Sequence, residues 1–175
     1  PTGHTNMAPT PQFPLQIVSA DRSLLNETVD EVEIPGAEGY FGVLGGHTPL
    51  LALLGTGELW YRMGSETHYL SLSGGFAEVQ PDRVTILAQN AERADEIDIA
   101  RAEAAKKRAE DRLQAMHPDM DFERARIALM KSLIRLQVAT RARVRGSCKH
   151  GPAPHAGPPR MFSRSEEHTS ELQSH

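Results

Sequence analysis

The sequence predicts an α+β protein in which a β domain precedes an α domain. Short β-rich segments separated by turn signals fill residues 15–90, and alanine-rich segments with apolar residues at steps of three and four fill residues 91–145. No helical pattern interrupts the first region, which argues against a parallel α/β sheet. The hexapeptide Ile97–Ala102 marks the change from one pattern to the other.

The β domain begins with the alternating segment Leu15–Ser19 and ends with the β-rich segment Arg83–Leu87. Between these two segments the sequence predicts strands in residues 29–34, 40–44, 59–63, 67–72 and 76–80, with turns at 35–36, 64–66 and 81–82. Short strands at this spacing are typical of a sandwich or barrel. Trp60 is expected in the core of this domain.

Two glycine clusters interrupt the predicted strands. Residues 44–49 have the backbone freedom of a sharp loop, and residues 73–76 are expected to form a β-bulge or a close backbone approach. Neither cluster has the spacing of a P-loop or of a dinucleotide-binding motif. The glycines therefore indicate turn chemistry and no phosphate-binding loop.

Two amphipathic helices are expected in the α domain. The first is capped by Asp95, carries a narrow face of small apolar residues, and ends near His117-Pro118, because proline cannot continue a helix. The second starts after Asp119 or Asp121 and carries two apolar stripes, formed by Ala125, Leu129, Leu133 and Leu136 and by Ile127, Met130, Ile134 and Val138. The first helix cannot cover both stripes, so we expect the hairpin to dock on the β domain or on another chain.

Composition and residue spacing argue against several classes of function. The net charge of −4 gives no case for nucleic-acid or anionic-membrane binding, and no apolar run approaches the length of a membrane helix, roughly 20 residues. The eight histidines lack metal-ligand spacing, and no nucleophile–base set has supporting context. We therefore expect no catalytic residue and no metal site.

The two ends of the chain are expected to lie outside the fold. Residues 1–14 read as a disordered or untranslated leader, with Met7 as a natural start. Residues 146–175 read as a disordered or artefactual tail that is rich in Gly, Pro and His. Within this tail, residues 164–174 look like the conceptual translation of a sequencing-adapter oligonucleotide.

Three segments in order resemble a known family: Gly46–Leu50, Ser73–Val79 and Val84–Ala88, followed by an alanine-rich helical hairpin. Together they resemble the epsilon subunit of bacterial F-type ATP synthase, the counterpart of the mitochondrial delta subunit. The resemblance covers residues 15–141 and departs from the family at Gly45, where proline is usual. It implies a flattened ten-stranded β-sandwich followed by a C-terminal antiparallel helical hairpin.

The resemblance also implies a function. Such a subunit is non-catalytic, forms the central stalk with the gamma subunit, and rests on the c-ring, so that it couples ring rotation to ATP synthesis. Its mobile helices can extend toward the alpha/beta head and inhibit ATP hydrolysis. The expected location is the cytoplasmic face of the bacterial inner membrane, reached only through the complex. Tyr40, Phe41 and His47 match the region that faces the c-ring or gamma.

Some family members bind ATP through an Ile/Leu-Asp-x-x-Arg-Ala motif, which this chain carries at residues 97–102. The matched positions predict a regulatory ATP site, with no cofactor required, formed by Glu92, Ile97, Asp98, Arg101, Ala102, Arg108, Lys131 and Arg135. Lys131 stands where a relative has arginine, so it keeps the charge and loses the bidentate fork. The simpler alternative is an ordinary exposed pair, Asp98 with Arg101. A free-standing ATP-sensing module is the second functional hypothesis.

Overall fold

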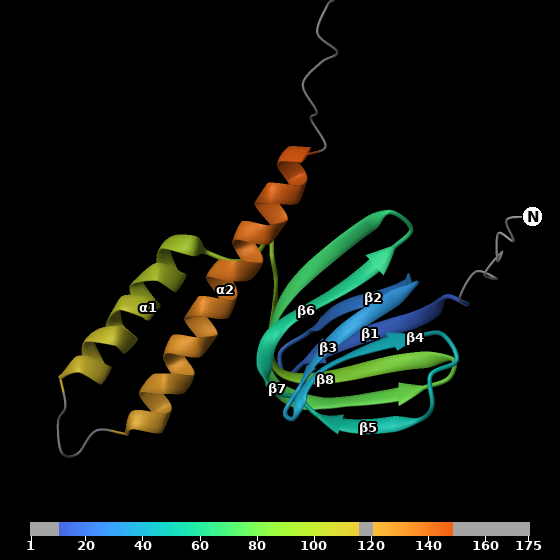
Figure 1. The fold of residues 1–175 in the computed structure, drawn as a ribbon, viewed down its shortest axis with the longest axis horizontal. Coiled ribbons are helices and arrows are strands. Elements are labelled where there is room, and N and C mark those ends of the chain that lie inside the picture. The colour runs from blue at the N-terminus through green and yellow to red at the C-terminus, as the bar shows by residue number, and fades with distance from the viewer. Residues whose placement is uncertain (1–10, 116–120, 149–175) are drawn as a thin grey trace, which may run out of the picture.

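The computed structural model describes residues 11–115 and 121–148, with side chains described as far as residue 144. A β domain comes first, with strands β1 (Phe13–Ser19), β2 (Ser23–Val29), β3 (Glu31–Gly36), β4 (Gly39–Leu44), β5 (Leu50–Leu53), β6 (Thr56–Met63), β7 (Glu66–Gln80) and β8 (Arg83–Arg93). Helices α1 (Ile99–Gln114) and α2 (Phe122–Cys148) follow. Figure 1 shows the helical hairpin at one end of the β domain. The predicted fold class, a β-sandwich followed by a helical hairpin, is confirmed.

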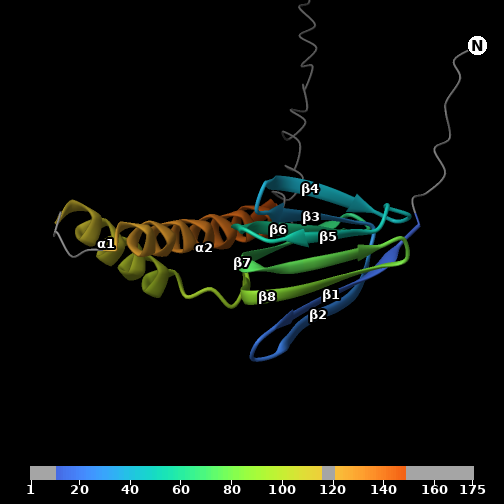
Figure 2. The ribbon, with the colours of Figure 1, turned by 90° about the horizontal axis from the view of Figure 1, so that it is seen from below.

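The strands form one continuous sheet in the order β2-β1-β8-β7-β6-β3-β4, and β5 pairs with β7 outside this path. Seen edge-on in Figure 2, the sheet folds into two layers, with β3, β4 and β5 in one layer and β1, β2 and β8 in the other. Strand pairing within the described residues is antiparallel except between β1 and β8, which are parallel. The alternating residues of both layers point inward and form the core, as in other sandwiches.

The described residues contain eight strands, where the family resemblance implied ten. The segments 67–72 and 76–80, which the sequence predicts as two strands, belong to the single strand β7, whose register with β8 is the same on both sides of the glycine pair. Gly75 has φ +119°, and a Cβ placed on it would lie 2.0 Å from the Leu87 carbonyl oxygen. The predicted close backbone approach is therefore present, and the chain bends there without ending the strand.

The core consists of the inward-facing residues of the strands. Leu15, Ile17, Leu59 and Ile86 are fully buried, in agreement with the alternation of their segments. Trp60 is not among them, so its expected place in the core was wrong. The tryptophan points to the other face of β6, is half-buried, and donates its indole N–H to the Glu33 carboxylate.

The first helix begins one turn later than expected. Asp98, not Asp95, is the N-cap of α1, because its Oδ1 accepts a hydrogen bond from the Arg101 backbone N–H at 3.0 Å. Asp95 instead lies in the linker and pairs with Arg93. Helix α1 ends at Gln114, and the predicted end near His117-Pro118 lies outside the described residues.

The second helix follows Asp121, whose Oδ1 accepts the Arg124 backbone N–H at 3.0 Å, and extends past the expected boundary at residue 145 to Cys148. In Figure 1, α2 lies between α1 and the sandwich, and its most extensive contacts with the β domain are to β6 and β7. Its buried residues are Ala125, Ser132, Val138 and Ala139. Three residues of its N-terminal half, Ile127, Met130 and Leu133, remain over 40% exposed (46%, 43% and 44%). Part of the predicted apolar surplus is therefore uncovered. We refer to α1 and α2 together as the arm.

Candidate functional site

The linker between β8 and α1 lies beside α2, and this arrangement gathers most of the predicted ATP-site residues. A cavity of about 140 Å³ is lined by Glu92, Glu96, Ile97, Asp98, Arg101, Ala102 and Arg135. Six of the eight predicted residues are in this set. Lys131 lines a neighbouring cavity of about 110 Å³, which shares Glu92 and Arg135 with the first. Arg108 is exposed on α1 and lines neither cavity.

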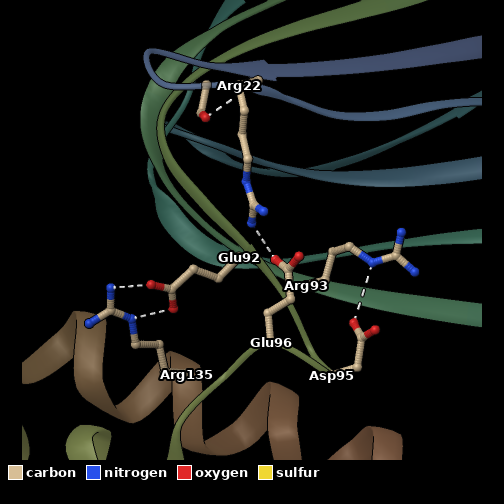
Figure 3. A network of polar contacts seen from close by, with 7 residues as sticks. Arg22, Glu92, Arg93, Asp95, Glu96 and Arg135 are labelled. Atoms are coloured by element: carbon tan, nitrogen blue, oxygen red, sulfur yellow. Dashed lines mark hydrogen bonds and ion pairs between the residues drawn. The ribbon is translucent and has the colours of Figure 1, made fainter.

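A bidentate ion pair crosses the site. The Arg135 Nε lies 2.7 Å from one oxygen of Glu92, and its second nitrogen donates to the other oxygen, also at 2.7 Å. Figure 3 shows this pair joining the end of β8 to α2. The side chains are 34% and 35% exposed, so water screens the pair only in part. It ties the arm to the sandwich.

Two further ion pairs hold the linker itself. Arg22, in the turn between β1 and β2, lies 2.5 Å from Glu96, and Arg93 lies 3.3 Å from Asp95 (Figure 3). The sequence analysis missed Arg22 and Glu96, because their separation of 74 residues leaves no local spacing to detect. The linker that precedes the arm is therefore held to the β1–β2 turn and to the end of β8.

The charged groups of the site already have partners. Asp98 is used as a helix cap, and Arg135 is held by Glu92. The larger adjoining cavity, at about 140 Å³, is smaller than typical ligand pockets of roughly 300–1,000 Å³. A nucleotide would have to displace these pairs or separate the helices to enter. The arrangement is thus a closed site in which the predicted ligand residues bind one another.

The predicted c-ring region divides into surface and core residues. Tyr40 on β4 is 55% exposed, whereas Phe41 packs against the hydrophobic core. His47 is half-buried, and its Nδ1 lies 2.7 Å from the Thr48 carbonyl oxygen. The loop around His47 is joined to the β7–β8 turn by a hydrogen bond from the Gly46 N–H to the Pro81 carbonyl. Tyr40 and His47 are therefore the accessible members of the predicted set.

The departure from the family pattern at Gly45 has a structural reason. A Cβ placed on Gly45 would lie only 1.9 Å from the Pro11 carbonyl oxygen, because the start of the described chain packs directly against this loop. Proline carries a Cβ, so the usual family residue does not fit here. The glycine is required by the close approach of Pro11, and the loop is closely packed at that point.

An apolar row that the sequence analysis did not predict crosses the outer surface of the sandwich. Leu53, Phe76 and Leu87 are register neighbours on β5, β7 and β8, and they are 57%, 52% and 56% exposed. Leu51, on the same side of β5, is 72% exposed. We call these four residues the apolar row. Contiguous exposed apolar side chains of this kind mark interaction surfaces.

Within residues 11–115 and 121–148, no cluster of three or more side chains has the composition and proximity to hold a metal ion. No helix in the part of the chain that the structure describes is long and apolar enough to cross a bilayer.

The fold and the closed site define a class of protein: a β-sandwich that carries a C-terminal helical arm held to it by ion pairs. Residues 12–94 match the β-sandwich domain model of the ATP synthase delta/epsilon chain, and residues 95–140 match the long α-helix domain model of the same chain. The chain belongs to the ATP synthase epsilon-subunit family.

Curated relatives and a solved structure agree with this assignment. The chain is 49% identical over 124 residues to the ATP synthase epsilon chain of Nitratidesulfovibrio vulgaris (strain DP4), an alignment that covers 71% of this chain and 92% of the relative. It is 50% identical over 125 residues to that of Syntrophobacter fumaroxidans, covering 71% and 93%. A chain in the mitochondrial ATP synthase of Euglena gracilis, in an assembly of OSCP, F1 and c-ring, matches with a TM-score of 0.57 and 25% identity, covering 82% of this chain and 89% of that chain.

Proposed function

We propose that the chain is a non-catalytic central-stalk subunit that couples c-ring rotation to ATP synthesis together with gamma. The observation that carries this proposal is the family match over both domains, residues 12–94 and 95–140. In this role the protein works at the cytoplasmic face of the bacterial inner membrane and is bound there through the complex. Its alternative, a free-standing ATP-sensing module, requires no stable partner.

The surfaces of the sandwich support contacts with other rotor subunits. The apolar row offers a surface that water covers in the isolated chain, and Tyr40 and His47 offer polar and aromatic groups on the loops. We assign the apolar row to gamma and the loops around Tyr40 and His47 to the c-ring. Burial of apolar area is the main favourable term in such an association.

Co-purification with a gamma–c-ring assembly tests this assignment. The wild-type chain is expected to be retained, and Phe76→Ser is expected to weaken retention because it removes the central side chain of the apolar row. Asn26→Ser, on the exposed surface of β2, is the matched control. Elution of the wild-type chain alone would support the free-standing module, and equal retention of both variants would place the gamma contact elsewhere.

The arm is the proposed inhibitory element. Its exposed apolar residues Ile127, Met130 and Leu133 lie in the N-terminal half of α2. An arm released from the sandwich would present these residues, together with Val138 and Ala139, to the alpha/beta head. A reconstituted complex with the chain cut after Ala94 is expected to hydrolyse ATP faster than the complete complex.

ATP is the proposed regulatory ligand of the closed site. The matched motif at residues 97–102 and the gathering of six predicted residues around one cavity support this assignment. Titration calorimetry of the folded chain with ATP tests it, with Arg101→Met as the variant that removes a basic group lining the cavity. Absence of heat at millimolar ATP for the wild type would reject the site.

A further inference from the structure

A buried carboxylate lies beneath the arm, away from the predicted ATP residues. Glu58 on β6 is 4% exposed, and its Oε1 accepts a hydrogen bond from Arg141 of α2 at 2.5 Å. Its second oxygen, Oε2, is buried with no hydrogen-bond partner among the described residues. Arg141 is 53% exposed, so the cation of this pair is largely hydrated while the anion is not.

Glu58 shares a cross-strand row with Glu92. Glu58 is the register partner of Ser71 on β7, and Ser71 is the register partner of Glu92 on β8. The two carboxylates are thus two strand spacings apart, about 9.6 Å at about 4.8 Å per strand. Their partners Arg135 and Arg141 are six residues apart on α2, a rise of roughly 9 Å. The match of these lengths sets where α2 crosses the sandwich.

The two ion pairs of this row differ in how much hydration their carboxylates lose. The Glu92–Arg135 pair is bidentate and partly hydrated at both ends. Glu58 has one direct hydrogen bond and has lost nearly all of its water. Removing a carboxylate from water costs more than a single ion pair with a hydrated partner returns. The arm therefore covers an under-satisfied charge when it lies on the sandwich.

We propose that Glu58 is a proton-dependent control on arm release: its ionised form opposes the docked arrangement seen in this structure, and its protonated form holds the arm on the sandwich. The proposal rests on the proposed mobility of the arm. A protonated Glu58 carries an O–H in place of one buried charge, so its burial under α2 costs less. Acidification thus favours the docked arm, and alkaline pH favours its release.

The groups that face Glu58 agree with this direction. Burial raises the pKa of Glu58, Arg141 and the Gln137 amide on α2 lower it, and Glu33 on β3 raises it; the burial effect is the largest. From β4, the Tyr40 hydroxyl accepts a hydrogen bond from the Glu58 backbone N–H at 3.3 Å. Because the docked pKa is raised, docking gains stability below it and loses that stability as pH rises through it. A difference of about one between the pKa of Glu58 in the docked and in the released arm changes the docking equilibrium about tenfold across that pH range.

Fluorescence energy transfer in the full chain tests the proposal. Cysteines replace Ser65, in the β6–β7 turn, and Gln114, at the end of α1, in a Cys148→Ser background. Transfer efficiency is measured from about pH 4 to about pH 8, because a raised carboxyl pKa lies above the ordinary glutamate value of about 4.3. For the wild type, the docked population is expected to fall as pH rises. Glu58→Gln is expected to remain docked with a flat profile, and Glu78→Gln, an exposed carboxylate on β7, to follow the wild type.

Two further variants distinguish an arm that does not move from an arm that moves without control by Glu58. Arg141→Met leaves Glu58 without the cation that lowers its docked pKa. The fall in docked population is therefore expected to be larger than in the wild type and to continue to higher pH. Glu58→Gln in the same chain is expected to restore docking. Arg135→Met is expected to lower the docked population at every pH. An unchanged signal in Arg135→Met would refute the mobility of the arm. A mobile arm with the same pH profile in wild type and Glu58→Gln would refute the role of Glu58.

Discussion

The ion pair between Glu92 and Arg135 gives the most direct stability prediction. Arg135→Met keeps the aliphatic stem of the side chain and removes both hydrogen bonds to the Glu92 carboxylate. Fully exposed pairs contribute about 0.2–1 kcal/mol, whereas breaking a buried pair costs about 3–5 kcal/mol. With both side chains about one-third exposed, solvent screening discounts the upper figure, and we expect the free energy of arm opening to fall by about 1–2 kcal/mol.

Native-state hydrogen exchange of the α2 amides measures this free energy. A double-mutant cycle with Glu92→Gln isolates the pair from other effects of each substitution and is expected to give a coupling of about 1 kcal/mol. The matched control is Glu123–Arg126, an i,i+3 pair on the same helix whose side chains are 71% and 65% exposed; its coupling is expected to be about 0.3 kcal/mol. Equal couplings for the two pairs would refute the reasoning.

Two other substitutions and one titration have defined outcomes. Gly75→Ala places a Cβ against the Leu87 carbonyl at positive φ, so the sandwich is expected to lose more than about 1 kcal/mol of unfolding free energy in urea, and an unchanged midpoint would contradict the close approach. Asp98→Ala removes the N-cap of α1 and is expected to cost about 1 kcal/mol, seen as faster amide exchange in its first turn only. The Gln12 amide and the Gly64 N–H lower the pKa of Asp30. Asp30 therefore stabilises the fold above its unfolded pKa, and this stabilisation is lost as pH falls through its folded pKa. Carbon-detected NMR titration is expected to give Asp30 a pKa below that of an ordinary aspartate.

Local patterns predicted the elements that depend on local chemistry. Alternation placed Leu15, Ile17 and Ile86 in the core, and the glycine pair at residues 74–75 indicated a close backbone approach. The cap of α1 was misplaced because Asp95 and Asp98 both fit a cap by residue type, and only the backbone path distinguishes them. Local sequence signals therefore predict the type of a secondary-structure element more securely than the residue at which it begins or ends.

Contacts between distant segments could not be predicted in the same way. Glu58 lies on an outward-facing position of β6, where strand alternation predicts exposure, and it is buried only because α2 covers it. The sequence motif named six residues that do meet at one cavity, yet it did not reveal that Glu92 and Arg135 bind each other. Residues 67–72 and 76–80 were predicted as two strands for a related reason, because a bend at Gly75 and a true strand end have the same local signature.

The central claim is that this chain is a stalk subunit whose arm restrains hydrolysis when it leaves the sandwich. The most direct measurement is ATP hydrolysis by the reconstituted complex with the full chain and with the chain cut after Ala94, where the β-sandwich match ends. We predict that both chains are retained in the complex and that the truncated chain gives the faster rate. Equal rates with both chains fully retained would contradict an inhibitory arm.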